Sequence, residues 1–290
     1  MKTLIHATDY SSNAVDALHY ANALRLQLAA KLILVHVYQV PLTMGSTTSI
    51  SHTKKVAQTA EEQRKRLRTF CNEHLGQVVC DRAVDLRAIQ GTSVREALLA
   101  LTTKESADLV VMGTQGENLL RKYVLGSTTT ALLEHAPCPI LAIPPNRPFR
   151  ALKNMVYATD FEASDRYALK ALLALAKPFR ARVHVVHIAQ SATPDPEKGM
   201  AHFKAQLEQE LPYEDLQWET HFGQDPYATL QEHLAKVEAD MVVMLERENG
   251  GFLKNLGHRD WVKRMKADGA LPLLCYQKKN LLPQHPGVGG

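Results

Sequence analysis

The stretch VVMGTQGENLLRKYVLGSTTTALL, Val110 to Leu133, begins with an apolar run typical of a buried strand and ends with a pattern typical of a helix. Between the two lie Gly113, Gly116 and Gly126, and hydroxyl residues follow the last glycine directly. A strand, a glycine-rich loop and a helix in this order are typical of α/β domains with a parallel sheet. The stretch therefore predicts such a domain and raises the question of what the loop holds.

The chain repeats itself around this stretch. IHATDYSSNAVDAL (residues 5–18) resembles VYATDFEASDRYAL (156–169), and the two ATD triplets are offset by 158 − 7 = 151. Further on, ADLVVMG (107–113) resembles ADMVVML (239–245) at an offset of 239 − 107 = 132. These ordered matches indicate two tandem copies of one domain, the second shorter in its middle by 151 − 132 = 19 residues. We expect domains at 1–146 and 152–277, a proline-containing connector between them and a loose tail at 278–290.

Strand and helix patterns alternate along each copy. In the first, apolar or alternating runs predict five strands, and residues at helical spacing predict four helices between them. The strands are expected at 3–8, 31–40, 81–90, 108–113 and 139–144, and the helices at 13–28, 53–75, 93–105 and 127–136. The second copy follows the same plan from 154–159 to 271–276. This alternation predicts an α/β fold in which a mostly parallel five-stranded sheet carries helices on both faces.

The composition excludes several classes of protein. Hydrophobic residues make up 45% and charged residues 22%, as in ordinary globular chains, and no apolar run approaches the roughly 18 residues of a membrane helix. The N-terminus lacks the apolar core of a signal peptide, so we expect a cytoplasmic protein. The net charge is +4, but basic residues stand beside acidic ones, which favours solvated faces over a nucleic-acid site. Four widely separated cysteines indicate buried thiols in a reducing compartment.

The glycine loop has two interpretations. Ligands of open parallel sheets bind at the carboxyl ends of the strands, and the loops after 3–8 and 108–113 share one crevice if these strands are neighbours. Gly113 lets the backbone approach a ligand, and Gly126 precedes a helix whose first N–H groups attract phosphate. Ser127 and Thr128 add hydroxyl donors. The spacing is neither a P-loop nor a Rossmann fingerprint, so a plain turn followed by a helix cap stays open beside a phosphate site.

The pattern G-x2-G-x9-G-[ST] after a VVMG strand, together with an early strand ending in ATD-x-S, resembles the universal stress protein family in its tandem two-domain form. The resemblance covers about residues 1–277 and implies ATP bound in a fold related to the adenine nucleotide alpha hydrolases. It implies contacts to adenine and ribose from Thr8, Asp9, Val37 (through its main chain), Met112 and Gly113, and contacts to the phosphates from Gly116, Gly126, Ser127 and Thr128. Asp9 and Ser127 are also residue types that commonly cap helix N-termini, so for each of them a ligand contact and a capping role both stay open.

The second copy departs from this pattern. Leu245 stands at the position of the first glycine, Glu248 at the second, and Gly257 precedes His258 instead of a hydroxyl residue. A glutamate repels phosphate, so we expect no ATP in this copy.

No pattern identifies a catalytic or metal site. His184 and His187 lie three apart in an expected strand, on opposite faces, so they do not chelate one ion easily. The chain has no H-E-x-x-H, no G-x-S-x-G and no nucleophile with its base. We therefore predict no metal ligands and no catalytic residues, and at most slow ATP hydrolysis, with Mg²⁺ able to accompany the phosphates.

These observations favour an ATP-binding universal stress protein with a regulatory or stress-resistance role, whose nucleotide lies in the N-terminal domain. The alternative is an ATP-independent scaffold or a ligand-binding pseudo-dimer, and an ATP-consuming enzyme is the weaker third hypothesis. The resemblance implies that the two copies pack through their last strands or adjoining helices, and that chains pair further as homo-oligomers. Neither a membrane nor a nucleic acid is an expected partner.

Overall fold

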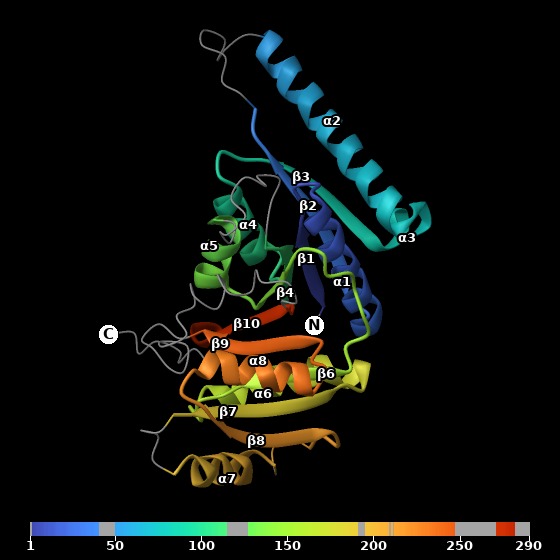
Figure 1. Cartoon of the computed structure of the whole chain (residues 1–290). Coiled ribbons are helices and arrows are strands. Elements are labelled where there is room, and N and C mark those ends of the chain that lie inside the picture. The colour runs from blue at the N-terminus through green and yellow to red at the C-terminus, as the bar shows by residue number, and fades with distance from the viewer. Residues whose placement is uncertain are drawn as a thin grey trace, which may run out of the picture. The chain divides into compact units, whose positions relative to one another are not determined.

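The structure is a computed structural model that describes residues 2–40, 50–114, 127–190, 195–208, 210, 212–246 and 271–281. The chain divides into two compact units (Figure 1). Unit 1 comprises Met1–Pro137 and Pro145–Phe149, and unit 2 comprises Cys138–Pro144 and Arg150–Gly290. Each unit is built from strands that alternate with helices, so the predicted α/β class with a mostly parallel sheet is confirmed.

The described residues of unit 1 form four parallel strands in the order β3-β2-β1-β4. They are β1 (Thr3–Ala7), β2 (Lys31–Tyr38), β3 (Val84–Gln90) and β4 (Leu109–Gly113). Helices α1 (Ser12–Leu28) and α2 (Ile50–Leu75) contact each other on one face of the sheet, and α4 (Val94–Lys104) and α5 (Ser127–His135) contact each other on the other face (Figure 1). The strand order reverses between β1 and β4, because the chain first builds outward through β2 and β3 and then returns to the other side of β1.

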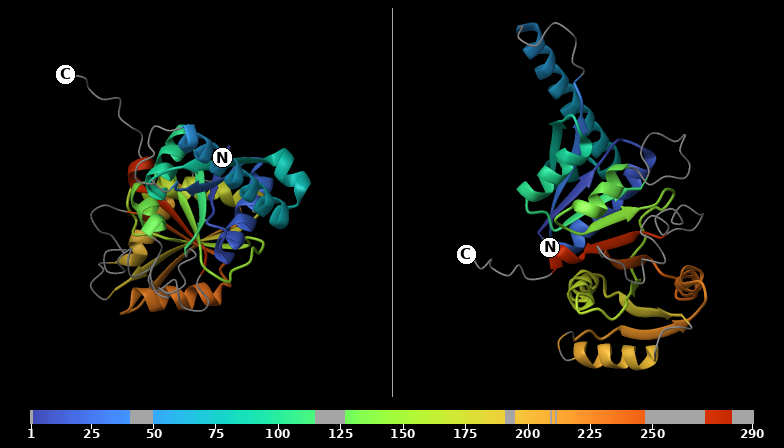
Figure 2. Two further views of the ribbon diagram at one scale, coloured as in Figure 1. Left: turned by 90° about the horizontal axis from the view of Figure 1, so that it is seen from above. Right: turned by 90° about the vertical axis from the view of Figure 1, so that its left-hand side faces the viewer.

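In unit 2, the part of the chain that the structure describes forms six strands in the order β5-β10-β9-β6-β7-β8. They are β5 (Ile140–Ile143), β6 (Asn154–Ala158), β7 (Arg182–Ala189), β8 (Leu216–Phe222), β9 (Met241–Glu246) and β10 (Leu273–Gln277). Helix α6 (Asp165–Ala176), followed by the short 3-10 helix η1 (Lys177–Phe179), and helix α8 (Pro226–Lys236) lie on opposite faces of this sheet (Figure 2, right). Helix α7 (Pro196–Leu207) packs on β7 and β8.

Strand β5 belongs to the first repeat by sequence but lies in unit 2. It pairs antiparallel with β10, with Leu141 opposite Leu274, whereas the other unit 2 pairings that the structure describes are parallel. The pairing joins the last strands of the two repeats, which is one of the contacts that the family resemblance implies.

Two segments differ from the sequence-based expectation. Residues 81–83 were predicted as the start of a strand, but they end the short helix α3 (Gln77–Ala83). Cys80 of this helix is buried, and Asp81 forms an ion pair with Arg68 of α2 at 2.6 Å. Residues 278–281, predicted as part of a loose tail, form α11 (Lys278–Leu281), where Lys278 Nζ lies 3.1 Å from Glu162. In both places a side-chain contact with a segment distant in sequence overrides a weak local pattern.

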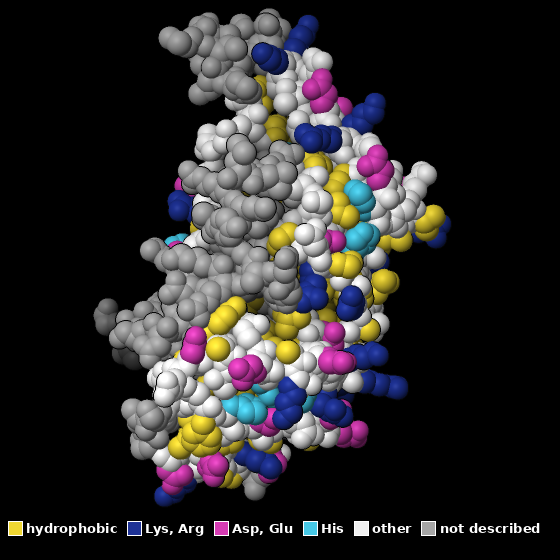
Figure 3. Space-filling model, in the orientation of Figure 1, with side chains coloured by type: hydrophobic (Ala, Val, Ile, Leu, Met, Phe, Trp, Pro, Cys, Tyr) yellow, Lys and Arg dark blue, Asp and Glu magenta, His cyan; other side chains and the backbone are white. Residues whose placement is uncertain are grey.

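Surface and core follow the composition. All four cysteines are buried and none forms a disulfide, as the sequence predicts. Acidic and basic side chains alternate along the exposed side of α2 (Figure 3), where Arg64 lies 3.5 Å from Glu61, as expected for a solvated face. Within the residues described here, no helix is both long enough and apolar enough to cross a membrane.

Candidate functional site

The carboxyl ends of β1 and β4 lie side by side in unit 1. The two strands are parallel neighbours in register, with Ala7 opposite Met112, so the sequence prediction that they are adjacent is confirmed. Thr8 and Asp9 follow β1, and Gly113 ends β4. Since the strand order reverses between these two strands, this edge is the topological switch point at which open parallel sheets bind ligands.

Short hydrogen bonds fix the turn after β1. The Thr8 amide donates to the Val35 carbonyl at 2.9 Å, and the Thr8 hydroxyl accepts from the Tyr10 amide at 3.0 Å. The Asp9 carboxylate accepts from both the amide and the hydroxyl of Ser11, at 3.1 and 2.6 Å. Ser11, in turn, is the N-cap of α1 and accepts from the Ala14 amide. Asp9 therefore does not cap the helix itself but holds the residue that does.

An aromatic residue and a histidine brace this turn. Tyr10 has the left-handed backbone conformation (φ 68°), which is rare for a bulky residue. The centroid of its ring lies 4.4 Å from that of the His36 ring. The guanidinium carbon of Arg66 lies 4.0 Å from the same Tyr10 centroid. The His36 imidazole donates from Nδ1 to the Thr8 carbonyl at 2.8 Å. We call this arrangement of Thr8, Tyr10 and His36 the strand-end clamp.

Gly113 is held by two neighbours at the end of β4. A Cβ atom at this position would meet the side chain of Asn13 at 2.6 Å, so the close approach of α1 to β4 requires glycine whether or not a ligand is present. The buried Thr129 hydroxyl donates to the Gly113 carbonyl at 3.2 Å. This bond ties the first turn of α5 to the end of β4, and so brings a helix N-terminus to the switch-point edge.

The remaining predicted residues divide into three groups. Met112 is buried, while Val37 is half-buried on β2 opposite Ile89. Ser127 is exposed as the first residue of α5, and Thr128 is half-buried beside it. Gly116 and Gly126, with the rest of the loop at 115–126, lie outside the described residues. The structure thus brings Thr8, Asp9, Met112 and Gly113 to the carboxyl ends of β1 and β4. Ser127 and Thr128 lie on α5, whose Thr129 donates the hydrogen bond to Gly113.

Burial keeps the ionisable groups around this edge uncharged. It lowers the pKa of His6, on β1, to about 4, against a smaller opposing effect of its hydrogen bond to the Val111 carbonyl. It also raises the pKa of Tyr10 to about 12, although the Arg66 guanidinium opposes this shift. At neutral pH both side chains are therefore neutral.

Comparison with known proteins decides the family. The model of the universal stress protein family matches residues 1–144 and 151–257, which together are most of the chain. The chain belongs to the universal stress protein family. Among its relatives, the universal stress protein in the QAH/OAS sulfhydrylase 3' region of Thermus aquaticus is 32% identical over 143 residues, which are 49% of this chain and 98% of the relative. Universal stress protein A homolog 1 of Coxiella burnetii is also 32% identical, over 49% of this chain and 95% of the relative.

Solved structures of universal stress proteins resemble the whole chain in fold. One from Archaeoglobus fulgidus aligns over 95% of this chain and 98% of its own, with a TM-score of 0.69 at 13% identity. One described as putative, from Pseudomonas aeruginosa, aligns over 96% and 93%, with a TM-score of 0.58 at 16% identity. At these identities the likeness shows the fold, which is the tandem arrangement of two domains that the repeats predict.

The second universal stress protein domain repeats the strand-end clamp. Phe161 has the same left-handed conformation as Tyr10 (φ 63°), and its amide donates to the Thr159 hydroxyl at 3.0 Å. The His187 imidazole donates to the Thr159 carbonyl at 2.8 Å and lies 4.3 Å from the Phe161 ring. The offsets 161 − 10 = 151 and 187 − 36 = 151 equal the offset of the ATD triplets, so the repeat extends to individual side-chain contacts.

A carboxylate distinguishes the second domain from the first. Asp165 is fully buried at the position that Ala14 occupies in the first repeat, since 165 − 151 = 14. It accepts from the Tyr157 hydroxyl at 2.7 Å, the Thr159 hydroxyl at 2.8 Å, and the amides of Asp160 and Glu162 at 3.2 and 3.0 Å. The hydrogen-bond donors at the end of β6 are thus satisfied by an anionic group of the protein itself, the Asp165 carboxylate.

Sequence reasoning named neither the clamp nor the residues that hold Gly113. Tyr10 and His36 could have been found, because both recur at the offset of 151, as Phe161 and His187. Asn13 and Thr129 left no such signal, since their roles depend on the packing of α1 and α5 against the end of β4.

Proposed function

We propose that this universal stress protein binds ATP at the switch-point edge of unit 1 and acts as a regulatory or stress-resistance protein in the cytoplasm. Thr8, Asp9, Met112, Gly113 and the main chain of Val37 receive the adenosine. Ser127, Thr128 and the glycines at 116 and 126 receive the phosphates, with Mg²⁺ able to accompany them. The working domain spans 1–146, and the second domain spans 152–277.

The hydrogen bond from Thr129 to Gly113 carries this proposal. It holds the N-terminus of α5 at the carboxyl end of β4, where unpaired amides of the first turn and the positive end of the helix attract phosphate oxygens. β1 lies directly beside β4, so the residues after it are within reach of the same ligand. Family membership supports the choice of a nucleotide, since the resemblance to universal stress proteins implies ATP.

We propose that the second domain does not bind ATP in the same way. Its strand end holds Asp165, whose negative charge already accepts the hydroxyl of Thr159 and two backbone amides. A phosphate brought to the same donors would meet this buried carboxylate, and Leu245 stands where the first domain has Gly113. The stoichiometry is therefore one nucleotide per chain.

The test is calorimetric titration of the full chain with ATP, ADP, AMP and cAMP, with and without Mg²⁺. cAMP is included because one solved universal stress protein structure is of a complex with cAMP. The informative variant is Ser127→Asp, because an acidic residue in the first turn suits a helix N-terminus but repels phosphate. A charge about 5 Å from a phosphate, at an effective dielectric constant of about 20, is worth up to roughly 3 kcal/mol before screening, so we expect ATP to bind at least about tenfold more weakly.

Ser127→Asn is the matched control, since it has a similar size without the charge, and it should bind ATP within about threefold of the wild type. Unchanged melting of both variants shows that the fold survives. If the wild-type chain binds no adenine nucleotide, the proposal fails, and the alternative of an ATP-independent scaffold replaces it. Phosphate release measured on the same samples separates binding from turnover: we expect at most slow release, and rapid release would identify an ATP-consuming enzyme.

A further inference from the structure

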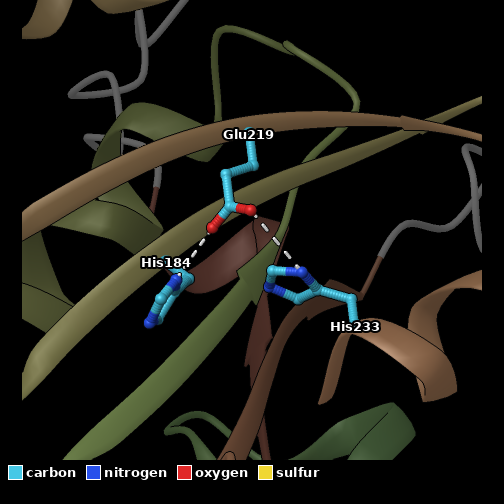
Figure 4. A group of neighbouring side chains, drawn as sticks. All are labelled: His184, Glu219 and His233. Atoms are coloured by element: carbon cyan, nitrogen blue, oxygen red, sulfur yellow. Dashed lines mark hydrogen bonds and ion pairs between the residues drawn. The ribbon is translucent and has the colours of Figure 1, made fainter. Parts of the chain in front are cut away.

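A cluster of histidines and one glutamate lies in unit 2, away from the strand ends discussed above. It consists of His184 on β7, Glu219 on β8 and His233 on α8 (Figure 4). One potential ligand atom from each residue lies within 4.8 Å of the other two. We propose that these three side chains bind a divalent transition-metal ion, with Zn²⁺ as the reference ion.

The sheet geometry turns the first two side chains to the same face. Glu219 is opposite Val186 in the β7–β8 pairing, and His184 is two residues from Val186, so the two side chains share a face of the sheet. Helix α8 packs on this face and supplies His233. His187, an odd number of residues from His184, is on the other face and binds the Thr159 carbonyl instead. The ligands therefore come from three different elements and are spaced too widely in the sequence to form a short motif.

The distances suit a small tetrahedral ion. His184 Nδ1 lies 2.9 Å from one carboxylate oxygen of Glu219, and His233 Nδ1 lies 3.7 Å from the other. Figure 4 shows the carboxylate between the two rings. Zinc bonds of about 2.0–2.2 Å in a tetrahedral site separate neighbouring ligand atoms by about 3.4 Å. Small rotations of the side chains are enough to reach this value.

The burial of unpartnered nitrogens is an independent reason to expect an ion. His233 is only 3% exposed, yet neither of its ring nitrogens has a hydrogen-bond partner among the residues that the structure describes, and the same is true of His184 Nε2. Burying such a group without a partner is unfavourable, because it loses its hydrogen bonds to water. Coordination to a metal would satisfy an imidazole nitrogen of His233 and convert this cost into binding.

The choice of ion follows from the ligand types. Two imidazoles and one carboxylate suit Zn²⁺ and its neighbours, whereas Mg²⁺ and Ca²⁺ prefer oxygen ligands. Glu219 keeps 29% of its side chain exposed and His221 beside it 27%, so the cluster is open to solvent on one side. His221 Nε2 lies 3.4 Å from Glu219 and has no hydrogen-bond partner within the described part of the chain. It is therefore available as a fourth ligand in place of water.

Charge also favours a cation here. Glu219 places a carboxylate 2.9 Å from the His184 ring and 3.7 Å from the His233 ring, so a negative group lies between two potential nitrogen ligands. A carboxylate and a neutral imidazole are the forms that coordinate metals.

The experiment uses the full chain without a polyhistidine tag, stripped with a chelator, dialysed against Zn²⁺ and analysed for metal content. We expect one Zn²⁺ per chain, a rise in Tm with added Zn²⁺, and no such rise with Mg²⁺. Competition with a chromogenic chelator gives the affinity. Since even residues that only support ligands contribute 10–100-fold, we expect Glu219→Gln and His233→Gln each to weaken binding at least about 100-fold.

His202→Gln is the matched control, because His202 is an exposed histidine on α7 of the same unit and should retain full affinity. If a cluster variant fails to fold, the visible spectrum of the Co²⁺-loaded wild-type chain decides, since tetrahedral coordination gives intense absorption and surface binding does not. Zinc content below one ion per chain, or equal loss of affinity in His202→Gln and the cluster variants, overturns the inference. Nucleotide binding enters none of these measurements, so the result is independent of the function proposed for unit 1.

Discussion

Replacing Asp165 by alanine is predicted to destabilise unit 2 severely. The carboxylate is fully buried and accepts at least four hydrogen bonds, three of them on Oδ2 and one on Oδ1. A hydrogen bond to a charged group contributes about 1.5–3 kcal/mol, but bonds to one carboxylate do not add independently. We expect a loss of about 4 kcal/mol in the free energy of unfolding, a large part of the stability of a typical domain.

Asparagine at the same position is predicted to cost less, about 1–3 kcal/mol. Its single carbonyl oxygen can keep the position of Oδ2, where the Thr159 hydroxyl and the amides of Asp160 and Glu162 converge. The amide group then faces the Tyr157 hydroxyl, which can rotate to accept a hydrogen bond. The difference between the two variants measures how much of the effect depends on the three donors at Oδ2.

Urea unfolding followed by tryptophan fluorescence is the appropriate assay, because Trp218 lies on β8 of unit 2 and the chain's other tryptophan, Trp261, also belongs to the second repeat by sequence. The control is Asp215→Asn, an exposed carboxylate 2.7 Å from Arg182, whose loss should cost no more than about 1 kcal/mol. The m-value should stay unchanged, so that a shift of the midpoint reports stability. If Asp165→Ala unfolds within 1 kcal/mol of the control, the internal-anion explanation of this strand end is wrong.

Three further predictions concern unit 1. Gly113→Ala should lower stability by about 1–3 kcal/mol in chemical denaturation, because the new Cβ meets Asn13, and by less in an Asn13→Ala background. His6→Gln should reduce the loss of stability on acidification. The folded-state pKa of His6, about 4, lies below the ordinary 6.5, so the unfolded chain binds the proton first and stability falls between these pH values, by up to about 3 kcal/mol. Cys71, whose thiol pKa is raised by burial and by Cys80, should react with thiol reagents only after unfolding.

Each of these has a contrary outcome. Equal costs of Gly113→Ala in both backgrounds would show that Asn13 is not the obstacle. Identical pH slopes for His6→Gln and the wild type, measured by circular dichroism from about pH 7 to about pH 4, would mean that His6 is protonated in the folded state. Rapid labelling of Cys71 in native buffer, detected by mass spectrometry of peptides, would show that α2 and α3 open readily.

The sequence was most informative where a pattern is local. Apolar runs and helical spacing predict the alternation of strands and helices, and the segments 53–75 and 127–136 correspond closely to α2 and α5. The adjacency of β1 and β4 was also predictable, because a doubly wound parallel sheet places its reversal there. Local pattern failed at 81–83 and 278–281, where Arg68 and Glu162, distant in sequence, stabilise helical turns.

The candidate sites depend on contacts that no local pattern records. Sequence reasoning explained Gly113 by the approach of a ligand, but the side chain of Asn13 alone already requires a glycine at this position. The same reasoning compared His184 with its neighbour His187 in the strand and predicted no metal ligands. Partners from β8 and α8 became visible only when the register of β7 and β8 and the packing of α8 were known.

The two repeats provide an internal comparison that separates the requirements of the fold from those of a ligand. The strand-end clamp is present in both, with His36 and His187 each donating to a threonine carbonyl, although the glycine pattern after β4 is absent from the second repeat. Because the clamp is present in the repeat that lacks the glycine pattern, it stabilises the turn after the first strand of each repeat and does not depend on the glycine loop. What differs between the strand ends is the residue at the start of the following helix: Ala14 in the first repeat, and in the second Asp165, which satisfies the local donors from within. The contrast between alanine and a buried carboxylate is therefore the physical basis for our proposal that only the first domain binds an external anion.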